Sequence, residues 1–389
     1  MTPYQSPPLE SASFVERPNR FIVLTDENGE RRRTYVANPG KLNEILLPGI
    51  TDVLLLSKPD TKTKFESLAA TWQSRWDGDR PRTVFLNTGR VNDVADAYLS
   101  QGLVPGLEDV TVKKREHTVG ESRFDFLLDT PEGECLLEVK SVTLVEEQMA
   151  LFPDAHSKRA TKHVEELTEL AADGTDTAVL FVVQGRAEHF LPDLHNDYDF
   201  ACALREASKQ LPIYAISVPP ELDADHRLVF PDDPRRLTIP WDRLDPVLDD
   251  SGLYLVVMEL EEPATLEIGA LGTFEFDPGF YTYIGSAQNG LAKRMRRHTR
   301  TRKRKHWHID YFRNAASSAK TFAIRGAEDE SALADDIADL GERHPPGFGA
   351  TDCPDDGHLV YTADNPISTP KFQRILTHWR HRRVFQTGD

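Results

Sequence analysis

Asp125, Glu138 and Lys140 are ionisable residues in two apolar tracts that are joined by a turn. The chain from Ser122 reads SRFDFLLDTPEGECLLEVKSVTL, which is typical of two β-strands and a hairpin turn. Side chains alternate between the faces of a strand, so Glu138 and Lys140 point to the same side. If the turn is symmetric, Asp125 lies opposite Glu138. The pattern therefore predicts two carboxylates and a lysine on one patch.

Two carboxylates at close range repel each other unless a cation lies between them. A hard divalent cation such as Mg²⁺ prefers oxygen ligands, and a nearby lysine can orient water or stabilise charge on a phosphate. The alternative is a set of exposed ion pairs between the strands. An Asp on one strand and Glu-X-Lys on the next resembles the PD-(D/E)XK nuclease superfamily. That resemblance implies a catalytic site that binds Mg²⁺ or Mn²⁺ through Asp125 and Glu138.

Several tracts along residues 17–218 resemble the sugar fermentation stimulation protein A family. In order, they are NPGKLNEILLPG, VFLNTGRVN, SRFDFLL, LLEVKSVTL, ALFPDAHSKRATKHVEEL and VLFVVQG. The resemblance implies an OB-like N-terminal subdomain before a PD-(D/E)XK nuclease-like core. It also implies DNA binding with a suspected nuclease activity, and it puts Asp125, Glu138 and Lys140 at the nuclease-like positions of the family.

Basic residues near this hairpin are candidates for binding the phosphates of DNA, or of RNA. Free N–H groups at a helix N-terminus favour phosphate, and a helix is predicted over residues 156–172. The alternative for each residue, including His163, is ordinary solvent exposure. Asn92 is expected to cap a helix. The four candidate phosphate-binding residues are Arg123, Lys158, Arg159 and Lys162.

A second constellation lies in the C-terminal part of the chain. GLYLVV and GFYTYIGSA read as strands, and LAKRMRRH reads as a helix on which Arg294 and His298 share a face. These tracts resemble the GIY-YIG nuclease fold. The resemblance implies a tyrosine that activates water, an arginine that neutralises the phosphate, and a glutamate that holds one divalent metal. The corresponding residues are Tyr254, Tyr283, Arg294, His298 and, as metal ligand, Glu330, with Glu328 as an alternative to Glu330.

The tracts KHWHIDYF and PPGFGATDC mark a closer resemblance, to a little-characterised relative of the GIY-YIG fold. The spacing from Tyr254 to Tyr283 is longer than in ordinary GIY-YIG nucleases, because a predicted hairpin, TLEIGALGTFEF, is inserted. His306 and His308 are expected to contact substrate or to pack, in preference to binding a metal. Cys353 is a single thiol, and no neighbouring residue supports it as a nucleophile.

Strands and helices alternate in the central part of the chain, which predicts an α/β sheet with parallel crossovers. Composition then shifts to a proline-rich stretch before new strand material begins. At 389 residues the chain is long enough for two domains. The predicted organisation is a tail (1–16), an OB-like subdomain (17–82), a PD-(D/E)XK nuclease-like domain (83–235), a linker (236–250) and a GIY-YIG-like α/β domain (251–389).

The net charge of −17 argues against a protein that coats nucleic acid uniformly. The charge is uneven, however, because residues 291–313 contain ten basic residues and one acidic residue. That window carries +9, so the rest of the chain carries −26. The basic run is a candidate phosphate-binding element, and the alternative is a solvated helix face. Beyond Arg294, the candidates are Arg297, Arg300, Arg302, Lys303, Arg304 and Lys305.

Composition also limits the location of the protein. Three cysteines cannot form a disulfide framework, and their positions match no zinc-ligand spacing. There is no run of 18 apolar residues and no signal-peptide pattern. We therefore expect a cytoplasmic location and no association with a membrane. The sequence does not predict an oligomeric state.

Both constellations point to phosphodiesters and a divalent metal. The leading prediction is therefore a DNA-binding, metal-dependent nuclease. The first alternative is a non-catalytic DNA-binding regulator of sugar metabolism that keeps a nuclease scaffold. The second is an enzyme that acts on a nucleotide- or sugar-linked substrate.

Overall fold

The computed structural model describes residues 4–74, 77–78, 80–350 and 356–385. The chain divides between Trp241 and Asp242 into two compact units, which we name the first unit and the second unit. This division falls within residues 236–250, where α4 (Trp241–Leu244) and a 3-10 turn (Asp245–Val247) add regular structure to the predicted linker. Among the described residues, no helix has the length and apolar character needed to cross a membrane.

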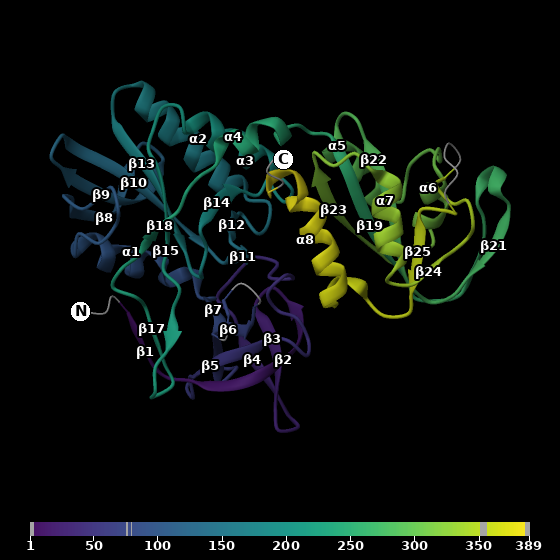
Figure 1. Ribbon diagram of the computed structural model, residues 1–389, viewed down its shortest axis with the longest axis horizontal. Coiled ribbons are helices and arrows are strands. Elements are labelled where there is room, and N and C mark those ends of the chain that lie inside the picture. Colours follow the sequence, from purple (N-terminus) through teal and green to yellow (C-terminus); the bar gives the residue numbers. More distant parts are fainter. Residues whose placement is uncertain (1–3, 75–76, 79, 351–355, 386–389) are drawn as a thin grey trace. The chain divides into compact units, whose positions relative to one another are not determined.

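The first unit begins with a small β-barrel (Figure 1). Its strands lie in the order β4-β3-β2-β5-β6-β7, and parallel pairing of Tyr35 with Glu66 joins β4 to β6 and closes the barrel. The five strands β2 to β6 thus form a closed barrel, with β7 paired to β6 beside it, and this is the OB-like subdomain that the sequence predicts. Asn28 and Gly29 have φ of 53° and 88°, as a two-residue turn between β3 and β4 requires. The strands are β2 (Glu10–Asn19), β3 (Ile22–Glu27), β4 (Glu30–Tyr35), β5 (Asp52–Ser57), β6 (Phe65–Gln73) and β7 (Pro81–Phe85).

The predicted tail over residues 1–16 is wrong for the part that the structure describes. β1 (Gln5–Pro8) pairs with β17 (Arg227–Val229), and β2 pairs with both β3 and β5. In β2 only Ala12 and Phe14 are buried, so the segment carries little hydrophobic periodicity. Main-chain hydrogen bonds to two neighbouring strands hold it in place, and these leave no mark in the sequence.

A six-stranded mixed sheet forms the core of the first unit. β8, β9 and β10 are antiparallel neighbours, and β10, β13 and β15 are parallel, which confirms the predicted crossovers. Every residue of β13 after Asp176 is buried, as expected for a central strand covered on both faces. The sheet order is β18 (Arg235–Arg236), β15 (Ile213–Ser217), β13 (Asp176–Val183), β10 (Gly133–Val142), β9 (Ser122–Thr130) and β8 (Thr111–Val119).

Helices cover this sheet on both faces. Leu137 of β10 packs in one cluster with α1 (Val91–Ser100), whereas Leu136 packs in another with α2 (Lys158–Ala172) and α3 (Tyr198–Ala207). The Ser157 hydroxyl accepts a hydrogen bond from Ala160 N at 3.2 Å and caps α2. Two smaller sheets complete the unit: β11 (Leu144–Glu146), β12 (Met149–Phe152) and β14 (His189–Pro192), and β1, β17 and β16 (Glu221–Leu222).

The second unit is a five-stranded antiparallel sheet with helices on both faces (Figure 1). α5 (Leu291–Thr299) and α6 (His308–Arg313) pack on one face, and α7 (Glu330–Ala338) and α8 (Pro370–Phe385) pack on the other. The predicted insertion is present as the hairpin of β20 (Ala264–Glu267) and β21 (Thr273–Phe276). The sheet order is β23 (Ser318–Arg325), β19 (Gly252–Leu260), β22 (Gly279–Ala287), β25 (Leu359–Thr362) and β24 (Glu342–Arg343).

Candidate active sites

The β9–β10 hairpin brings Asp125 and Glu138 to the place where the two strands separate. The paired residues run from Thr130 with Gly133 to Phe126 with Leu137, which is the register that the sequence predicts. Beyond Leu137, a side chain replaces the main-chain partner, because Oδ2 of Asp125 accepts a hydrogen bond from the main-chain N–H of Val139 at 2.8 Å. The strand ladder therefore ends at the candidate site, and a side chain replaces it.

A helix residue fixes the other oxygen of Asp125. Asn92, in the first turn of α1, donates from Nδ2 to Asp125 Oδ1 at 2.7 Å. The sequence predicts a capping role for Asn92, but the structure shows no side-chain cap hydrogen bond at this helix. The sequence shows Asn92 only as a polar residue at the start of a helix, so it could not identify Asp125 as the partner of Asn92.

Glu138 is buried among the side chains of β10 and α2. Its Oε1 receives the Lys140 ammonium and lies 2.6 Å from Nδ1 of His163. Its Oε2 is also buried and has no hydrogen-bond partner among the described residues. His163 shares the apolar face of α2 with Ala160 and Val164, and that position was the clue to its inward direction.

The electrostatics of the two carboxylates differ. Burial raises the pKa of Asp125, and the neighbouring charge of Glu138 raises it further. Burial also acts to raise the pKa of Glu138, but hydrogen bonding to His163 and the charge of Lys140 outweigh it, so the pKa is lowered. Glu138 is therefore held as a carboxylate beside a second acid, and an added cation would relieve their repulsion.

The donor set at this site fits a hard divalent cation in part. Asp125 and Glu138 offer carboxylate oxygens, and Glu138 Oε2 is buried without a donor. Lys140 bonds directly to Glu138, so the predicted convergence of the three residues includes an ion pair. Within the described ranges, no group of three or more His, Cys, Asp or Glu side chains is placed to hold a metal. Other ligands would have to come from main-chain carbonyls, water or substrate.

The predicted phosphate-binding residues around this site are exposed. Lys158 and Arg159 lie in the first turn of α2, the helix that also supplies His163. Lys162 pairs with Glu166 at 3.3 Å, and Arg123 pairs with Glu116 at 3.4 Å on the outer hairpin. Lys158 and Arg159 thus have the position and freedom that phosphate binding requires, whereas Lys162 and Arg123 already have anionic partners.

In the second unit, Tyr254 lies directly opposite Gly285 on the paired strands β19 and β22. The Tyr254 hydroxyl lies 3.0 Å from Nε2 of His298 on α5, and the Tyr254 and Tyr283 ring centroids are 6.3 Å apart. A Cβ at residue 285 would lie 2.5 Å from Tyr254 Cζ, so only glycine leaves room for the ring. The structure therefore brings Tyr254, Tyr283 and His298 together.

Arg294 and Glu330 approach the same pair of tyrosines. Burial is the main reason that the pKa values of Tyr254 and Tyr283 are raised. The negative charge of Glu330 adds to the rise, and the positive charge of Arg294 opposes it. Glu330 is the first residue of α7, and its Oε1 lies 3.0 Å from Nδ1 of His358. Glu328, the alternative to Glu330, is exposed.

His298 is almost fully buried, and its charge state follows from that. Burial, together with the positive charge of Lys303, lowers the pKa of His298 to about 3. The imidazole is therefore neutral near pH 7, and it can accept a hydrogen bond from the Tyr254 hydroxyl.

Two residues of the basic run are engaged inside the protein. Arg297 makes two hydrogen bonds to the buried carboxylate of Asp310, at 2.8 and 2.9 Å, and Lys303 Nζ lies 2.8 Å from the same carboxylate. One carboxylate offsets only one of the two positive charges, so the binding of phosphates by Arg297 and Lys303 stays a prediction. Of the predicted phosphate-binding residues of the run, those that are exposed are Arg300, Arg302, Arg304 and Lys305.

The two histidines of the KHWHIDYF tract differ in exposure, since His308 is half-buried and His306 is exposed. His308 Nδ1 accepts a hydrogen bond from Gly349 N at 3.0 Å, and the His306 ring lies against Trp307. Neither belongs to a metal-binding group among the described residues. Cys353 lies outside the residues that the structure describes.

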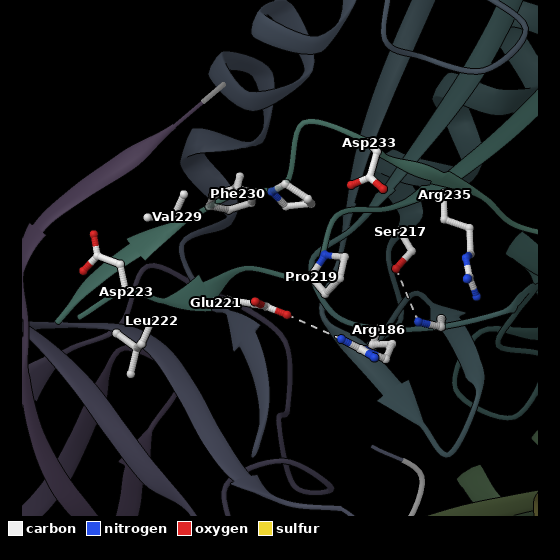
Figure 2. Close-up of a pocket in the computed structure, with 12 residues that line it drawn as sticks. Arg186, Ser217, Pro219, Glu221, Leu222, Asp223, Val229, Phe230, Asp233 and Arg235 are labelled. Atoms are coloured by element: carbon white, nitrogen blue, oxygen red, sulfur yellow. Dashed lines mark hydrogen bonds and ion pairs between the residues drawn. The ribbon is translucent and has the colours of Figure 1, made fainter. Parts of the chain in front are cut away.

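Two cavities of the first unit differ in their relation to the site. A cavity of about 390 Å³ is lined by Lys140, Thr88 and His156 and lies beside the first constellation. A larger one of about 540 Å³ contains none of the predicted site residues in its lining. Figure 2 shows that Arg186 in this larger pocket is directed toward Glu221, 3.5 Å away. The smaller cavity is therefore the one to consider for substrate.

Three family models match the chain in the order of the predicted domains. Residues 15–77 match the SfsA N-terminal OB domain, and residues 89–222 match the sugar fermentation stimulation protein RE domain. Residues 253–380 match a domain of unknown function, DUF123, which is GIY-YIG-related. A homologue from Methanothermobacter thermautotrophicus is 38% identical over 59% of this chain and 92% of its own length. The chain belongs to the sugar fermentation stimulation protein family.

Other members and a solved structure agree with that assignment. The Chloroflexus aurantiacus homologue is 38% identical over 54% of this chain and 80% of its own length. The structure of Pyrococcus furiosus SfsA in complex with Ca²⁺ matches with 27% identity and a TM-score of 0.52. It covers 61% of this chain and 99% of the solved chain. The fold is therefore an OB-like subdomain with a PD-(D/E)XK nuclease-like core, followed by a GIY-YIG-like α/β domain.

Proposed function

We propose that this protein binds DNA and hydrolyses phosphodiester bonds at the first constellation, with a divalent cation held by Asp125 and Glu138. The observation that carries the proposal is the meeting of these carboxylates at the end of the β9–β10 ladder, with Glu138 Oε2 buried and without a donor. Pyrococcus furiosus SfsA was solved in complex with Ca²⁺, which supports a divalent cation in this family. The proposal includes a cytoplasmic location.

Each residue of this site has a part in the proposed reaction. Asn92 and Val139 N orient Asp125, and His163 orients Glu138. Lys140 lines the adjacent cavity, and its ammonium can stabilise negative charge on a phosphate or orient the attacking water. Bound Mg²⁺ or Mn²⁺ would supply Lewis acidity and a water of lowered pKa.

The second constellation supports a further phosphodiester-binding site in the same proposal. Arg294 would neutralise the phosphate, and Glu330 would hold a cation. The neutral imidazole of His298 can accept a hydrogen bond from the Tyr254 hydroxyl and so orient that oxygen toward water. Tyr283 would complete the site beside Tyr254.

A cleavage panel with matched variants tests the proposal. The protein is incubated with Mg²⁺, Mn²⁺ or Ca²⁺ and with single-stranded, duplex or branched DNA, or with RNA. Glu138→Gln is expected to reduce cleavage by about 100-fold or more, because the carboxylate charge at the cation is lost. Glu134→Gln is the control, since Glu134 lies on the same strand but is exposed and pairs with Lys113. Tyr283→Phe reports separately on the second site.

A non-catalytic DNA-binding regulator is the second candidate. The observation that favours it is the absence of a three-ligand metal group among the described residues, together with the direct bond from Lys140 to Glu138. DNA binding by the wild type without cleavage under any metal and substrate condition would support the regulator and contradict the nuclease.

A further inference from the structure

Two aromatic side chains on the barrel are exposed side by side. Phe21 is 45% exposed and Tyr35 is 40% exposed, and their rings are stacked with centroids 6.4 Å apart and planes 16° apart. The main chain holds them together, because Val36 N donates to Phe21 O at 3.0 Å. Water-exposed aromatic rings that stack on each other leave a flat apolar surface on the outside of the barrel.

Cationic side chains continue this surface along β4. Three alternate residues of this strand are exposed: Arg31, Arg33 and Tyr35. Thr34, between two of them, is buried, and its hydroxyl donates to Val23 O. Arg31 and Arg33 make no ion pair among the described residues. Arg32, in the opposite phase, is paired with Glu10 and Glu27. The outward row is thus Arg-X-Arg-X-Tyr, with its charges available to a partner.

Arg20 links this surface to the first candidate active site. It is exposed, it immediately precedes Phe21, and it also lines the cavity that contains Lys140. The barrel is fixed on the core at this point, since Asn38 Nδ2 donates to Thr143 Oγ1 at 3.3 Å. Arg20 therefore lies both next to the aromatic pair in the chain and at the cavity of the candidate active site.

Single-stranded DNA has the chemistry that this surface would recognise. In a duplex the faces of the bases stack on each other, so they cannot stack on protein rings, whereas an unpaired strand exposes them. Stacking on aromatic rings with arginines along the backbone is a general mode of single-strand binding. We propose that Phe21 and Tyr35 stack bases of single-stranded DNA, while Arg20, Arg31 and Arg33 hold its phosphates and direct the strand to Lys140. This inference rests on the proposed function.

Binding of a labelled oligothymidylate to the full chain tests the inference by fluorescence anisotropy. The double variant Phe21→Leu/Tyr35→Leu keeps apolar side chains but removes the rings. It is expected to bind the oligonucleotide about 5- to 100-fold more weakly. Ile50→Ala is the matched control, because Ile50 is 43% exposed on the same barrel but is not part of the aromatic pair. Unchanged circular dichroism and thermal midpoint would show that the double variant is folded.

A second pair of variants tests the charged row. Arg31→Ala/Arg33→Ala should weaken binding and flatten its salt dependence, by about 0.7 in the slope of log K against log salt for each phosphate that the protein no longer neutralises. Lys62→Ala is the control, since Lys62 is exposed on the β5–β6 connection of the same barrel. An equal loss in Lys62→Ala would show a general charge effect and overturn the inference.

The outcomes separate this inference from the proposed function. If the wild type binds and cleaves DNA, but the double aromatic variant binds oligothymidylate as tightly as the wild type, the inference is overturned and the proposed function stands. If the aromatic variant loses single-strand binding but still cleaves a preferred duplex at the wild-type rate, the inference is supported as a binding role. If the wild type binds no DNA, both are overturned.

Discussion

At the scale of single residues, Gly285 shows how closely the second site is packed. A methyl group at this position would overlap Tyr254 and come within 3.0 Å of Tyr283 Cε1. We expect Gly285→Ala to displace the Tyr254 ring from His298 and to destabilise the second unit by about 1–3 kcal/mol, as overpacking does. Urea unfolding measures the loss. Gly290→Ala is a comparison, although its φ of 65° adds strain, because a Cβ there meets no atom closer than 3.9 Å.

His298 gives the second unit a defined pH dependence. Its pKa in the folded state is about 3, below the ordinary histidine value of 6.5. Between these two pH values the unfolded state therefore binds a proton at His298 and the folded state does not. Stability is therefore lost as the pH falls below about 6.5. Between pH 6.5 and 5, we expect the wild type to lose about 1.6 kcal/mol more than His298→Asn.

Urea unfolding at the two pH values measures the difference in the transition of the second unit. His306→Asn, at an exposed histidine, is the control and should keep the wild-type slope. Equal slopes in the wild type and His298→Asn would contradict a buried neutral imidazole.

The residues of the first site were predictable where one hairpin positions them. The turn between β9 and β10 fixes the register, so the neighbourhood of Asp125 and Glu138 follows from local sequence alone. Asn92 and His163 come from α1 and α2, which meet the hairpin only through tertiary packing. The ion pair of Arg297 could not be predicted for the same reason, since its partner Asp310 lies 13 residues away on another helix.

At the scale of elements, Asp310 joins α6 to the end of α5 and to the loop between them. Its carboxylate accepts hydrogen bonds from Arg297 and from the main-chain N–H groups of His306 and Trp307. Burial alone would raise its pKa, but these bonds and Lys303 lower it far below its usual value. The helices and the loop are thus held by one buried anion.

Replacing that anion should destabilise the second unit. We expect Asp310→Asn to cost about 3–5 kcal/mol in the free energy of unfolding, because Arg297 and Lys303 are left without a counter-charge. Asp335→Asn is the control, since Asp335 is exposed and its pair with Arg343 should contribute less than about 1 kcal/mol. A similar small loss in both variants would show that the Asp310 cluster is not what holds these elements.

Elements with a strong hydrophobic period were predictable, and those without one were not. The helix α2 begins within two residues of the predicted start, because Ala160, Val164 and Leu167 mark its buried face. β2 was missed because its place depends on pairing with β3 and β5, and this pairing is made by main-chain groups that every sequence has.

At the scale of the whole molecule, a strongly acidic chain has a dense group of exposed cations in residues 300–305. We expect a variant with Gln at Arg300, Arg302, Arg304 and Lys305 to bind duplex DNA more weakly. The slope of log K against log salt should fall by about 0.9 for each phosphate left without its cationic partner. Binding titrations at several salt concentrations measure this. Lys209→Gln, which removes an exposed cation paired with Glu206, should leave the slope unchanged.

The pairing of β1 with β17 also orders events during synthesis. Residue 5 finds its partner only when Val229 has been made, whereas the last barrel strand, β7, ends at Phe85. At a translation rate of roughly 5–20 residues per second, about 7–30 s separate the synthesis of Phe85 from that of Val229. β1 therefore stays unpaired for that time although all the barrel strands have been made, and the first unit is closed by two segments that lie near its opposite ends in the sequence.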